Sequence, residues 1–230
     1  MLPTYNEKQN LERVVAGVRR LGHDVMVVDD ASPDGTGEIA VRLAAGDPGI
    51  RVLHRPRKLG LGSAYEDAFR IGLEDDGTHF FVEMDADGSH RPEDLAAIVA
   101  AARKSGGLAL GSRYIPGGAI EGWPFHRWLL SWAANIYCRV LLWLPTRDTT
   151  SGYRCYTRDL LQHIGLDEVV SQGYSFQIEM VYRAKRLGYP VVEVPIRFED
   201  RVAGASKVSQ GEVRRALLTV LRLRLRRWKR

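Results

Sequence analysis

The sequence predicts an α/β fold, a mostly parallel sheet flanked by helices, in one globular domain. Short apolar runs alternate with segments whose apolar residues keep helical spacing, which is typical of strands joined by covering helices. The 230 residues, 45% of them hydrophobic, are enough for one sizeable core. No internal repeat, low-complexity segment or linker divides the sequence, so a single domain is expected.

The first residues read as the end of a strand and the start of a helix. Leu2 and Pro3 resemble the last residues of a strand that is otherwise missing, which indicates a late start codon or a truncated chain. Asn6 is expected to cap a helix whose apolar residues run from Leu11 to Leu21. Gly22 is expected to end this helix.

The remaining expected elements keep the alternation. Further strands are expected at residues 25–28, 50–54, 78–82, 108–114 and 191–198. Helices are expected after residue 36, at 65–73, from Pro92, and at 128–144 and 176–187. The stretch 128–144 contains Asn135 and Arg139, so it falls short of a transmembrane span, and no signal peptide precedes it.

Charge is distributed unevenly along the chain. The segment 214–230 carries eight basic residues and no acidic one, so it contributes +8 to a net charge of +5 and leaves −3 on the rest. A mildly acidic globule with a basic tail argues against a nucleic-acid binder. The two cysteines match no metal or redox motif, which favours a reducing cytosolic setting.

Two carboxylates end the expected strand at 78–82. Asp85 and Asp87 lie two residues apart, so in an extended segment they face the same side while Ala86 points away. Two carboxylates suit a hard cation such as Mg²⁺ or Mn²⁺, which takes further oxygen ligands from water and phosphate. An isolated pair of this kind is more often a solvated loop, so the rest of the sequence must decide.

Other polar positions suit anions, each weakly on its own. The loop 60–63 precedes a helix and matches no dinucleotide fingerprint, so a tight turn explains it as well as a phosphate cradle does. Arg113 follows a strand, and Arg127 and Ser131 share one helical face. Arginine and lysine in these places suit phosphate oxygens, although each alone reads as an ordinary surface charge. Two more such residues lie in a loop of small residues: Arg201 and Lys207.

Taken in order, the motifs resemble the dolichyl-phosphate mannosyltransferase (polyprenol monophosphomannose synthase) family. The matching segments are LPTYNE, VVDDASPDGT, RPRKLGLGSAY, MDADGSH, GSRY, TSGYR, GYSFQIEMVYRA and the run from EVPI to GASK. This family belongs to inverting glycosyltransferase family 2, with the GT-A fold. The resemblance covers almost the whole chain to Lys207 and implies transfer of mannose from GDP-mannose to a polyprenyl (dolichyl-type) phosphate, releasing GDP.

The resemblance also implies a donor site. Its guanosine side would be lined by Pro3, Tyr5, Glu7, Val28 and Asp30. The diphosphate and metal would be held by Asp85, Ala86 and Asp87, with Asp87 as the direct ligand. Some relatives carry Leu-Gln after the DAD motif where this chain has Gly88 and Ser89, and Ser89 is expected to coordinate the metal directly or through water.

The remaining carried-over residues bind phosphates. Arg113, Arg201 and Lys207 would contact the donor phosphates and, with Asp87, form the catalytic set. Arg127 and Ser131 would hold the acceptor phosphate, with Arg113 shared. An acceptor phosphate is already anionic near neutral pH, so the absence of a serine–histidine pair is no obstacle. A sister polyprenyl-phosphate glucosyltransferase that uses UDP-glucose shares most motifs and stays open as an alternative.

The C-terminal tail is expected to meet the membrane that holds such an acceptor. The interpretation divides the chain into a GT-A domain at 1–212 and a basic amphipathic tail at 213–230. As a helix, the tail places Leu217, Leu221, Leu225 and Trp228 on one side. The alternation over 222–226 equally suits an edge strand, and a solvated terminus is the plain alternative. A peripheral location at the cytoplasmic membrane face is expected, and a separate membrane subunit is left open.

Overall fold

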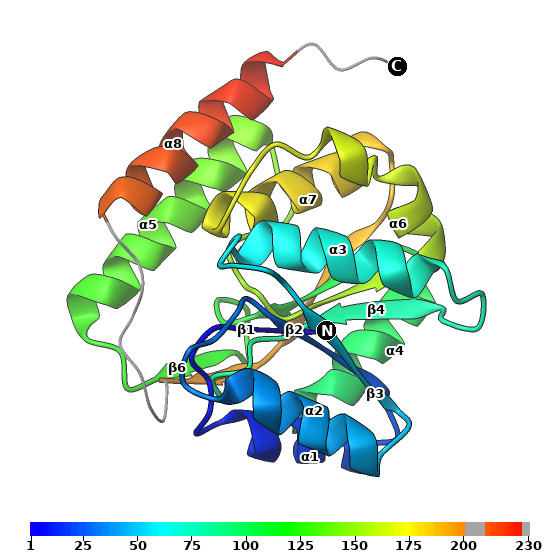
Figure 1. Cartoon of the computed structure of the whole chain (residues 1–230). Coiled ribbons are helices and arrows are strands. Elements are labelled where there is room, and N and C mark those ends of the chain that lie inside the picture. Colours follow the sequence, from blue (N-terminus) through cyan, green and yellow to red (C-terminus); the bar gives the residue numbers. More distant parts are fainter. Residues whose placement is uncertain (201–209, 227–230) are drawn as a thin grey trace.

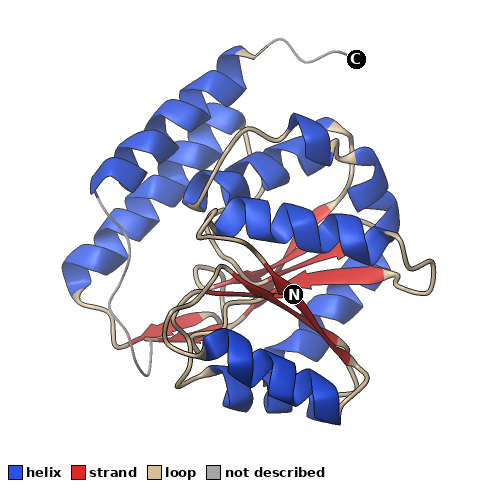
Figure 2. Ribbon diagram, in the orientation of Figure 1, coloured by secondary structure: helices blue, strands red, loops and turns tan. Residues whose placement is uncertain are grey.

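A central sheet lies between two layers of helices in the computed structural model, which describes residues 1–200 and 210–226 (Figure 1). Figure 2 shows the strands crossing the middle of the molecule with helices above and below them. Three strands form a parallel sheet in the order β1 (Leu2–Thr4), β2 (Val25–Asp29) and β3 (Ile50–His54). Its central strand β2 is buried along its whole length, as expected for a parallel strand covered on both faces.

A second sheet continues from the first. Its order is β4 (Phe80–Glu83), β7 (Arg154–Thr157), β5 (Leu108–Ser112) and β8 (Val191–Pro195). Strand β7 is antiparallel to both neighbours, whereas β5 and β8 are parallel. The Met1 ammonium donates to the Val82 carbonyl (2.8 Å) and the Met84 amide donates to the Met1 carbonyl (3.3 Å), so β1 lies beside β4. A small parallel pair, β6 (Ala119–Glu121) and β9 (Arg197–Glu199), lies to one side.

Helices cover both faces of the sheet. One face carries α1 (Leu11–Arg20), α2 (Thr36–Gly46) and α4 (Leu95–Ser105), which follows the 3₁₀ helix η1 (Pro92–Asp94). The other carries α3 (Leu61–Leu73), α6 (Arg158–His163) and α7 (Tyr174–Arg186), with the 3₁₀ helix η2 (Leu166–Glu168) before α7. One apolar core lies on each side of the sheet, around Leu11, Val27 and Ile98 and around Phe69, Tyr156 and Phe176.

Two helices lie side by side outside α7: α5 (Phe125–Leu142) and α8 (Gln210–Leu225) (Figure 1). Val220 and Leu223 of α8 are buried in the core shared with α5 and α7. The Tyr137 hydroxyl donates to the Leu217 carbonyl (3.2 Å), which fixes α8 along α5. Of the two interpretations of the tail, helix and edge strand, the structure has the helix.

Most predicted elements are present, with shifted ends. Asn6 does not cap the first helix: it has a positive φ of 63°, and α1 begins only after Asn10. The helix expected at 128–144 starts three residues earlier and ends at Leu142, because Trp143 adopts a left-handed conformation with φ 55°. Across residues 1–200 and 210–226, every helix is too short or too polar to cross a bilayer.

Candidate active site

Consecutive acids at the end of β2 point to opposite faces of the sheet. The Asp30 carboxylate accepts hydrogen bonds from the amides of Leu59 (3.1 Å) and Gly60 (2.9 Å), just before α3. Arg55 completes this arrangement through an ion pair with Asp30 at 2.9 Å, and both side chains are buried. The Asp30 carboxylate therefore holds the start of the glycine loop 60–63 in place. The sequence alone was equally consistent with a tight turn and with a phosphate-binding loop here.

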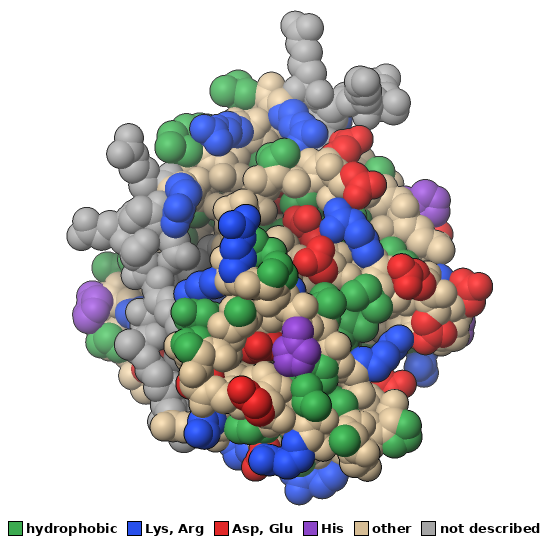
Figure 3. Space-filling model, in the orientation of Figure 1, with side chains coloured by type: hydrophobic (Ala, Val, Ile, Leu, Met, Phe, Trp, Pro, Cys, Tyr) green, Lys and Arg blue, Asp and Glu red, His purple; other side chains and the backbone are tan. Residues whose placement is uncertain are grey.

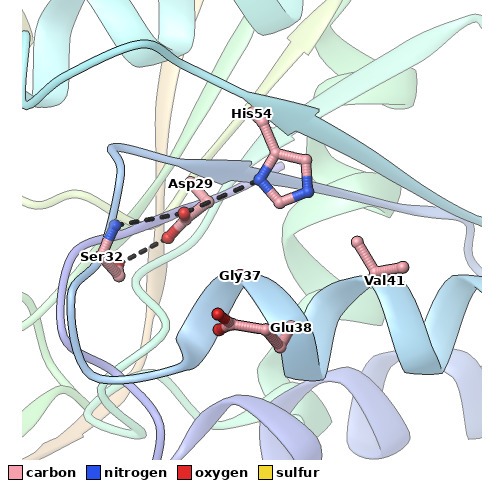
Figure 4. Close-up of a pocket in the computed structure, with 6 residues that line it drawn as sticks. All are labelled: Asp29, Ser32, Gly37, Glu38, Val41 and His54. Atoms are coloured by element: carbon pink, nitrogen blue, oxygen red, sulfur yellow. Dashed lines mark hydrogen bonds and ion pairs between the residues drawn. The ribbon is translucent and has the colours of Figure 1, made fainter.

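Asp29 faces the other way, toward α2. Its carboxylate accepts hydrogen bonds from the Thr4 hydroxyl (3.2 Å) and from the Ser32 hydroxyl (2.5 Å) and amide (3.2 Å). Figure 4 shows the shallow hollow beside it, lined by Asp29, Ser32, Gly37, Glu38, Val41 and His54. None of the predicted donor residues lines this hollow.

The predicted guanosine residues gather at the ends of β1 and β2. Pro3 pairs with Val28 in the sheet register, and the Val28 side chain is fully buried under α3. The Tyr5 ring lies under the Lys58 ammonium at 3.8 Å, and the Glu7 amide donates to the Thr36 hydroxyl at 3.0 Å. Pro3, Tyr5, Glu7 and Asp30 thus lie at or just after the ends of β1 and β2, whereas Val28 is paired on both sides in the central strand and its side chain is buried.

The DAD loop follows β4 directly. Asp87 is buried, and one of its carboxylate oxygens accepts hydrogen bonds from the amide (2.9 Å) and hydroxyl (2.6 Å) of Ser89. The Asp85 side chain is 32% exposed, whereas Ala86 packs in the core. Gly88 has a φ of 82°, a conformation that a side chain would strain, and it lets the chain turn back immediately after Asp87.

His90 supports this loop from below. Its Nδ1 accepts a hydrogen bond from the Asp85 amide (3.0 Å), and its ring stacks on Tyr153 with centroids 4.8 Å apart. Burial lowers the pKa of His90, which agrees with a neutral ring whose Nδ1 is an acceptor. A hydrogen-bonded, stacked histidine thereby fixes the backbone from which Asp85 projects.

The loop 148–153 closes over the DAD motif. A Cβ at Gly152 would lie 3.5 Å from an Asp85 carboxylate oxygen, so the two loops are in contact distance. Arg154 is fully buried and donates to the carbonyls of Thr149, Ser151 and Gln177, each at 2.6 Å. These bonds tie the loop to α7 and hold it against Asp85.

The oxygen atoms of the DAD loop are of the chemical type that binds a hard cation. Asp85, Asp87 and Ser89 offer carboxylate and hydroxyl oxygens, the ligands that Mg²⁺ and Mn²⁺ prefer. Within residues 1–200 and 210–226, no group of three or more His, Cys, Asp or Glu side chains is arranged as a complete metal site. The residues therefore fit an ion that completes its shell with substrate and water oxygens.

Arg113 lies at the end of β5 and forms a two-pronged pair with Asp148. Its Nε and Nη2 donate to the two Asp148 carboxylate oxygens at 2.7 Å each, and its amide donates to the same carboxylate at 2.9 Å. Asp148 is fully buried and its amide donates to Glu193 (2.9 Å). Such a planar fork fixes the direction of the guanidinium far more tightly than a single ion pair would.

A hydroxyl connects Arg113 to α5. The Thr150 hydroxyl accepts from Arg113 Nη2 (3.1 Å) and from the Asn135 side-chain amide (3.1 Å). Asn135 is buried on α5, and its carbonyl oxygen accepts from the Thr150 amide at 3.2 Å. The helix that carries the predicted acceptor residues is therefore hydrogen-bonded to the loop that holds Arg113.

Arg127 and Ser131 lie one turn apart on α5, as predicted. The Arg127 guanidinium is 4.0 Å from the centroid of the Trp123 ring and pairs with Asp200 at 3.0 Å. Arg113 lies over the same Trp123 ring at 5.3 Å. One indole thus brings the two predicted phosphate-binding arginines into a single cluster.

Sequence reasoning missed the residues that hold these arginines. Asp148, Thr150, Asn135 and Trp123 act through tertiary contacts, and their sequence positions give no spacing signal. Only the motif TSGYR, which begins at Thr150, pointed to this loop, and it does not include Asp148. The predicted residues Arg201 and Lys207 lie outside the described residues.

Comparison with known proteins identifies the family. The family model described as glycosyl transferase family 2 matches residues 1–165. The chain belongs to glycosyl transferase family 2. This glycosyltransferase is 49% identical over 224 residues to the undecaprenyl-phosphate mannosyltransferase of Micrococcus luteus, covering 96% of this chain and 91% of that protein. It is 48% identical over 223 residues to the polyprenol monophosphomannose synthase of Mycolicibacterium smegmatis, covering 96% and 84%.

Solved structures share the fold of this family 2 glycosyltransferase. The complex of Mycobacterium tuberculosis glucosyl-3-phosphoglycerate synthase with Mn²⁺, UDP and glucosyl-3-phosphoglycerate has a TM-score of 0.66 at 20% identity, covering 97% of this chain and 77% of that one. Another crystal structure of the M. tuberculosis enzyme has a TM-score of 0.60 at 21% identity, covering 97% of this chain and 78% of that one. Together with the family match, these likenesses confirm the predicted α/β GT-A fold.

Proposed function

We propose that the protein transfers mannose from GDP-mannose to a polyprenyl phosphate, giving polyprenyl phosphomannose and GDP. The observation that carries this proposal is the near-complete match, at 49% and 48% identity, to two proteins named for mannose transfer to polyprenyl phosphates. The clustering of Arg113 and Arg127 around Trp123 supports it, because a phosphate acceptor needs cations near the DAD loop.

The donor half of the reaction is assigned to the ends of β1, β2 and β4. Pro3, Tyr5, Glu7, Val28 and Asp30 would border the nucleoside. Asp85, Asp87 and Ser89 would hold a divalent cation, Mg²⁺ or Mn²⁺, which would neutralise charge on the diphosphate. Ala86 would contribute its backbone, since its side chain is buried.

The acceptor half is assigned to Arg113, Arg127 and Ser131. An acceptor phosphate oxygen would form the new bond to the anomeric carbon, while the bond from that carbon to the diphosphate oxygen breaks and GDP leaves with the electron pair. Attack from the face opposite the leaving group inverts the anomeric centre. A phosphate is already anionic near neutral pH, so no strong base is required. From the family resemblance, Arg201 and Lys207 would stabilise the charge on departing GDP.

The exposed face of α5 suits contact with the bilayer that contains such an acceptor. Large apolar side chains recur every three or four residues from Phe125 to Trp143, each at least 40% exposed. They are Phe125, Leu129, Trp132, Ile136, Val140 and Trp143. On the neighbouring α8, Leu217, Leu221 and Leu225 are exposed as well, whereas Trp228 lies outside the described residues. Apolar side chains with tryptophan and adjacent arginine are typical of helices that lie in a membrane interface.

The test is transfer of labelled mannose to a short-chain polyprenyl phosphate by the full chain. Product is expected with GDP-mannose, in the presence of Mg²⁺ or Mn²⁺, and expected to disappear when the ion is chelated. UDP-glucose in place of GDP-mannose is the critical donor control. Glucosyl product from UDP-glucose, without mannosyl product from GDP-mannose, would establish the polyprenyl-phosphate glucosyltransferase instead.

A further inference from the structure

A basic pocket lies at the C-terminal end of α5, at the other end of this helix from Arg127 and Ser131. It is lined by Leu142, Trp143, Tyr182, Lys185, Arg186 and Arg224. These residues come from three helices that meet there: the end of α5, the end of α7 and the second half of α8. Three cationic side chains from two helices thus share one pocket.

In the described part of the chain, no carboxylate forms an ion pair with the cations of this pocket. The Lys185 ammonium already donates hydrogen bonds to two backbone carbonyls at the end of α5, those of Leu142 (3.2 Å) and Trp143. Within residues 1–200 and 210–226, Arg186 and Arg224 have no carboxylate partner within 4.0 Å. Burial, reinforced by the charges of Arg186 and Arg224, lowers the pKa of Lys185. Like charges held together in this way favour an anionic ligand.

Exposed apolar residues accompany the cations of the pocket. Trp143, which lines the pocket, is 73% exposed, and Leu225, which follows the lining residue Arg224, is 81% exposed. Leu187, directly after α7, is also exposed. Figure 3 shows basic and hydrophobic side chains next to one another at the upper end of its face, where Figure 1 places α8. A site for a soluble anion needs no such apolar side chains, whereas a lipid offers a phosphate and acyl chains together.

We propose that this pocket binds the phosphate headgroup of an anionic phospholipid, with Arg186 and Arg224 on the phosphate and Trp143 and Leu225 in the acyl region. The proposal rests on the proposed function, because it assumes that the protein works at a bilayer. With 18 residues, α5 extends for about 27 Å. A lipid at one end and the acceptor phosphate at the other would lay the apolar face of α5 along the membrane plane.

The experiment compares two double variants that lose the same charge. Arg186→Ala with Arg224→Ala removes the two arginines of the pocket, and Arg215→Ala with Arg222→Ala removes two exposed arginines of α8 that do not line it. Binding of each full chain is measured with phosphatidylcholine vesicles, with and without phosphatidylglycerol. The pocket variant is expected to bind the phosphatidylglycerol vesicles about tenfold more weakly than the control variant, since hydrogen-bonded charges contribute more than diffuse attraction.

Three results would overturn the proposal. Equal losses in the two variants would indicate general electrostatic attraction. Displacement of the wild-type chain from vesicles by millimolar inorganic phosphate would indicate a site for free phosphate. Displacement by a DNA duplex with an equal concentration of phosphate groups would indicate a nucleic-acid surface. Thermal unfolding of both variants, expected within a few degrees of wild type, excludes misfolding as the cause.

Mannosyl transfer to a short acceptor in detergent separates this proposal from the proposed function. The pocket variant is expected to keep the wild-type transfer rate there, because the pocket lies away from the reacting groups. Failure of the wild-type chain to transfer mannose would refute the proposed function and leave the vesicle result standing. Normal transfer combined with equal vesicle binding by both variants would refute the lipid site alone.

Discussion

The acids that end β2 and those that end β4 lie at the same edge of the sheet but have different roles. Asp29 and Asp30 are consecutive, so they point to opposite faces, and each is held by a neighbouring loop. Asp85 and Asp87 are two residues apart, and Asp85 keeps 32% of its side chain exposed. Asp29 and Asp30 thus organise two loops, whereas Asp85 and Asp87 lie in the turn after β4 and are proposed to hold one cation.

The two acidic pairs also differ in the residues that contact them. At β2 the carboxylates accept hydrogen bonds from loop amides and hydroxyls and meet the buried Arg55, which stabilises the fold. At β4 the Asp87 carboxylate accepts hydrogen bonds only from Ser89 of its own loop among the contacts described above, and His90 and the loop around Gly152 contact Asp85 from outside. We therefore expect substitution of Asp29 or Arg55 to reduce mainly stability and substitution of Asp87 to reduce mainly activity.

The largest effect is expected at Asp87. In Asp87→Ala, mannosyl transfer should fall by about a thousandfold or more, since charge neutralisation at the diphosphate contributes several kcal/mol. The matched variant Asp29→Ala should keep transfer within about tenfold while its free energy of unfolding falls by about 1–3 kcal/mol, because the hydroxyls of Thr4 and Ser32 lose their acceptor. Steady-state assays and urea denaturation test both. Near-normal turnover in Asp87→Ala would refute the metal assignment.

Arg55→Ala should give the largest loss of stability at β2. It leaves the buried Asp30 carboxylate without its cation, which typically costs about 3–5 kcal/mol. The control Arg51→Ala removes an arginine that is half exposed and pairs with Asp75 at the long distance of 3.9 Å. Its free energy of unfolding is therefore expected to change by about 0.5 kcal/mol or less. Urea denaturation measures both. Equal effects in the two variants would contradict the buried pair as an organiser of the glycine loop.

Thr150→Val tests how the acceptor side is positioned. Losing the hydroxyl that joins Arg113 to Asn135 should raise the KM for polyprenyl phosphate about five- to tenfold, with little change in the KM for GDP-mannose. Thr149→Val is the matched control, because in the described part of the chain the Thr149 hydroxyl is hydrogen-bonded to that of Thr146 (2.9 Å) and to neither Arg113 nor Asn135. A similar KM rise in both variants would indicate a general packing effect.

The smallest effect is a pH dependence at the β2 turn. Burial opposes ionisation of Asp34, but hydrogen bonds from the Thr36 hydroxyl and amide and from the Lys8 amide outweigh it and lower its pKa. This stabilisation is present above the unfolded value of about 3.9 and is lost as the pH falls through the lower folded value. Urea denaturation from about pH 5 to pH 2 should show a shallower loss in Asp34→Asn. Identical pH profiles of Asp34→Asn and the wild-type chain would show that Asp34 does not contribute to stability in acid.

The sequence determined the fold class, because alternating apolar runs predicted the strands. The common side expected for Asp85 and Asp87 in an extended segment stays a prediction, since β4 ends at Glu83 and the two residues lie in the turn that follows it. The same local reasoning failed at Asn6, because the first loop is bonded to Ser32 and to the turn after β2 instead of starting a helix. Residues far apart in sequence override a capping preference whenever they offer the backbone other partners.

Only the tertiary structure decided which residues hold the arginines and how α5 and α8 are oriented. Asp148 is 35 residues from Arg113, and Trp123 lies between two arginines that no periodicity relates. The hydrophobic pattern of the tail fits a helix, yet burial of Val220 and Leu223 fixed which face points outward. Long-range contacts of this kind depend on how the elements pack, whereas spacing in the sequence records only which residues share a face.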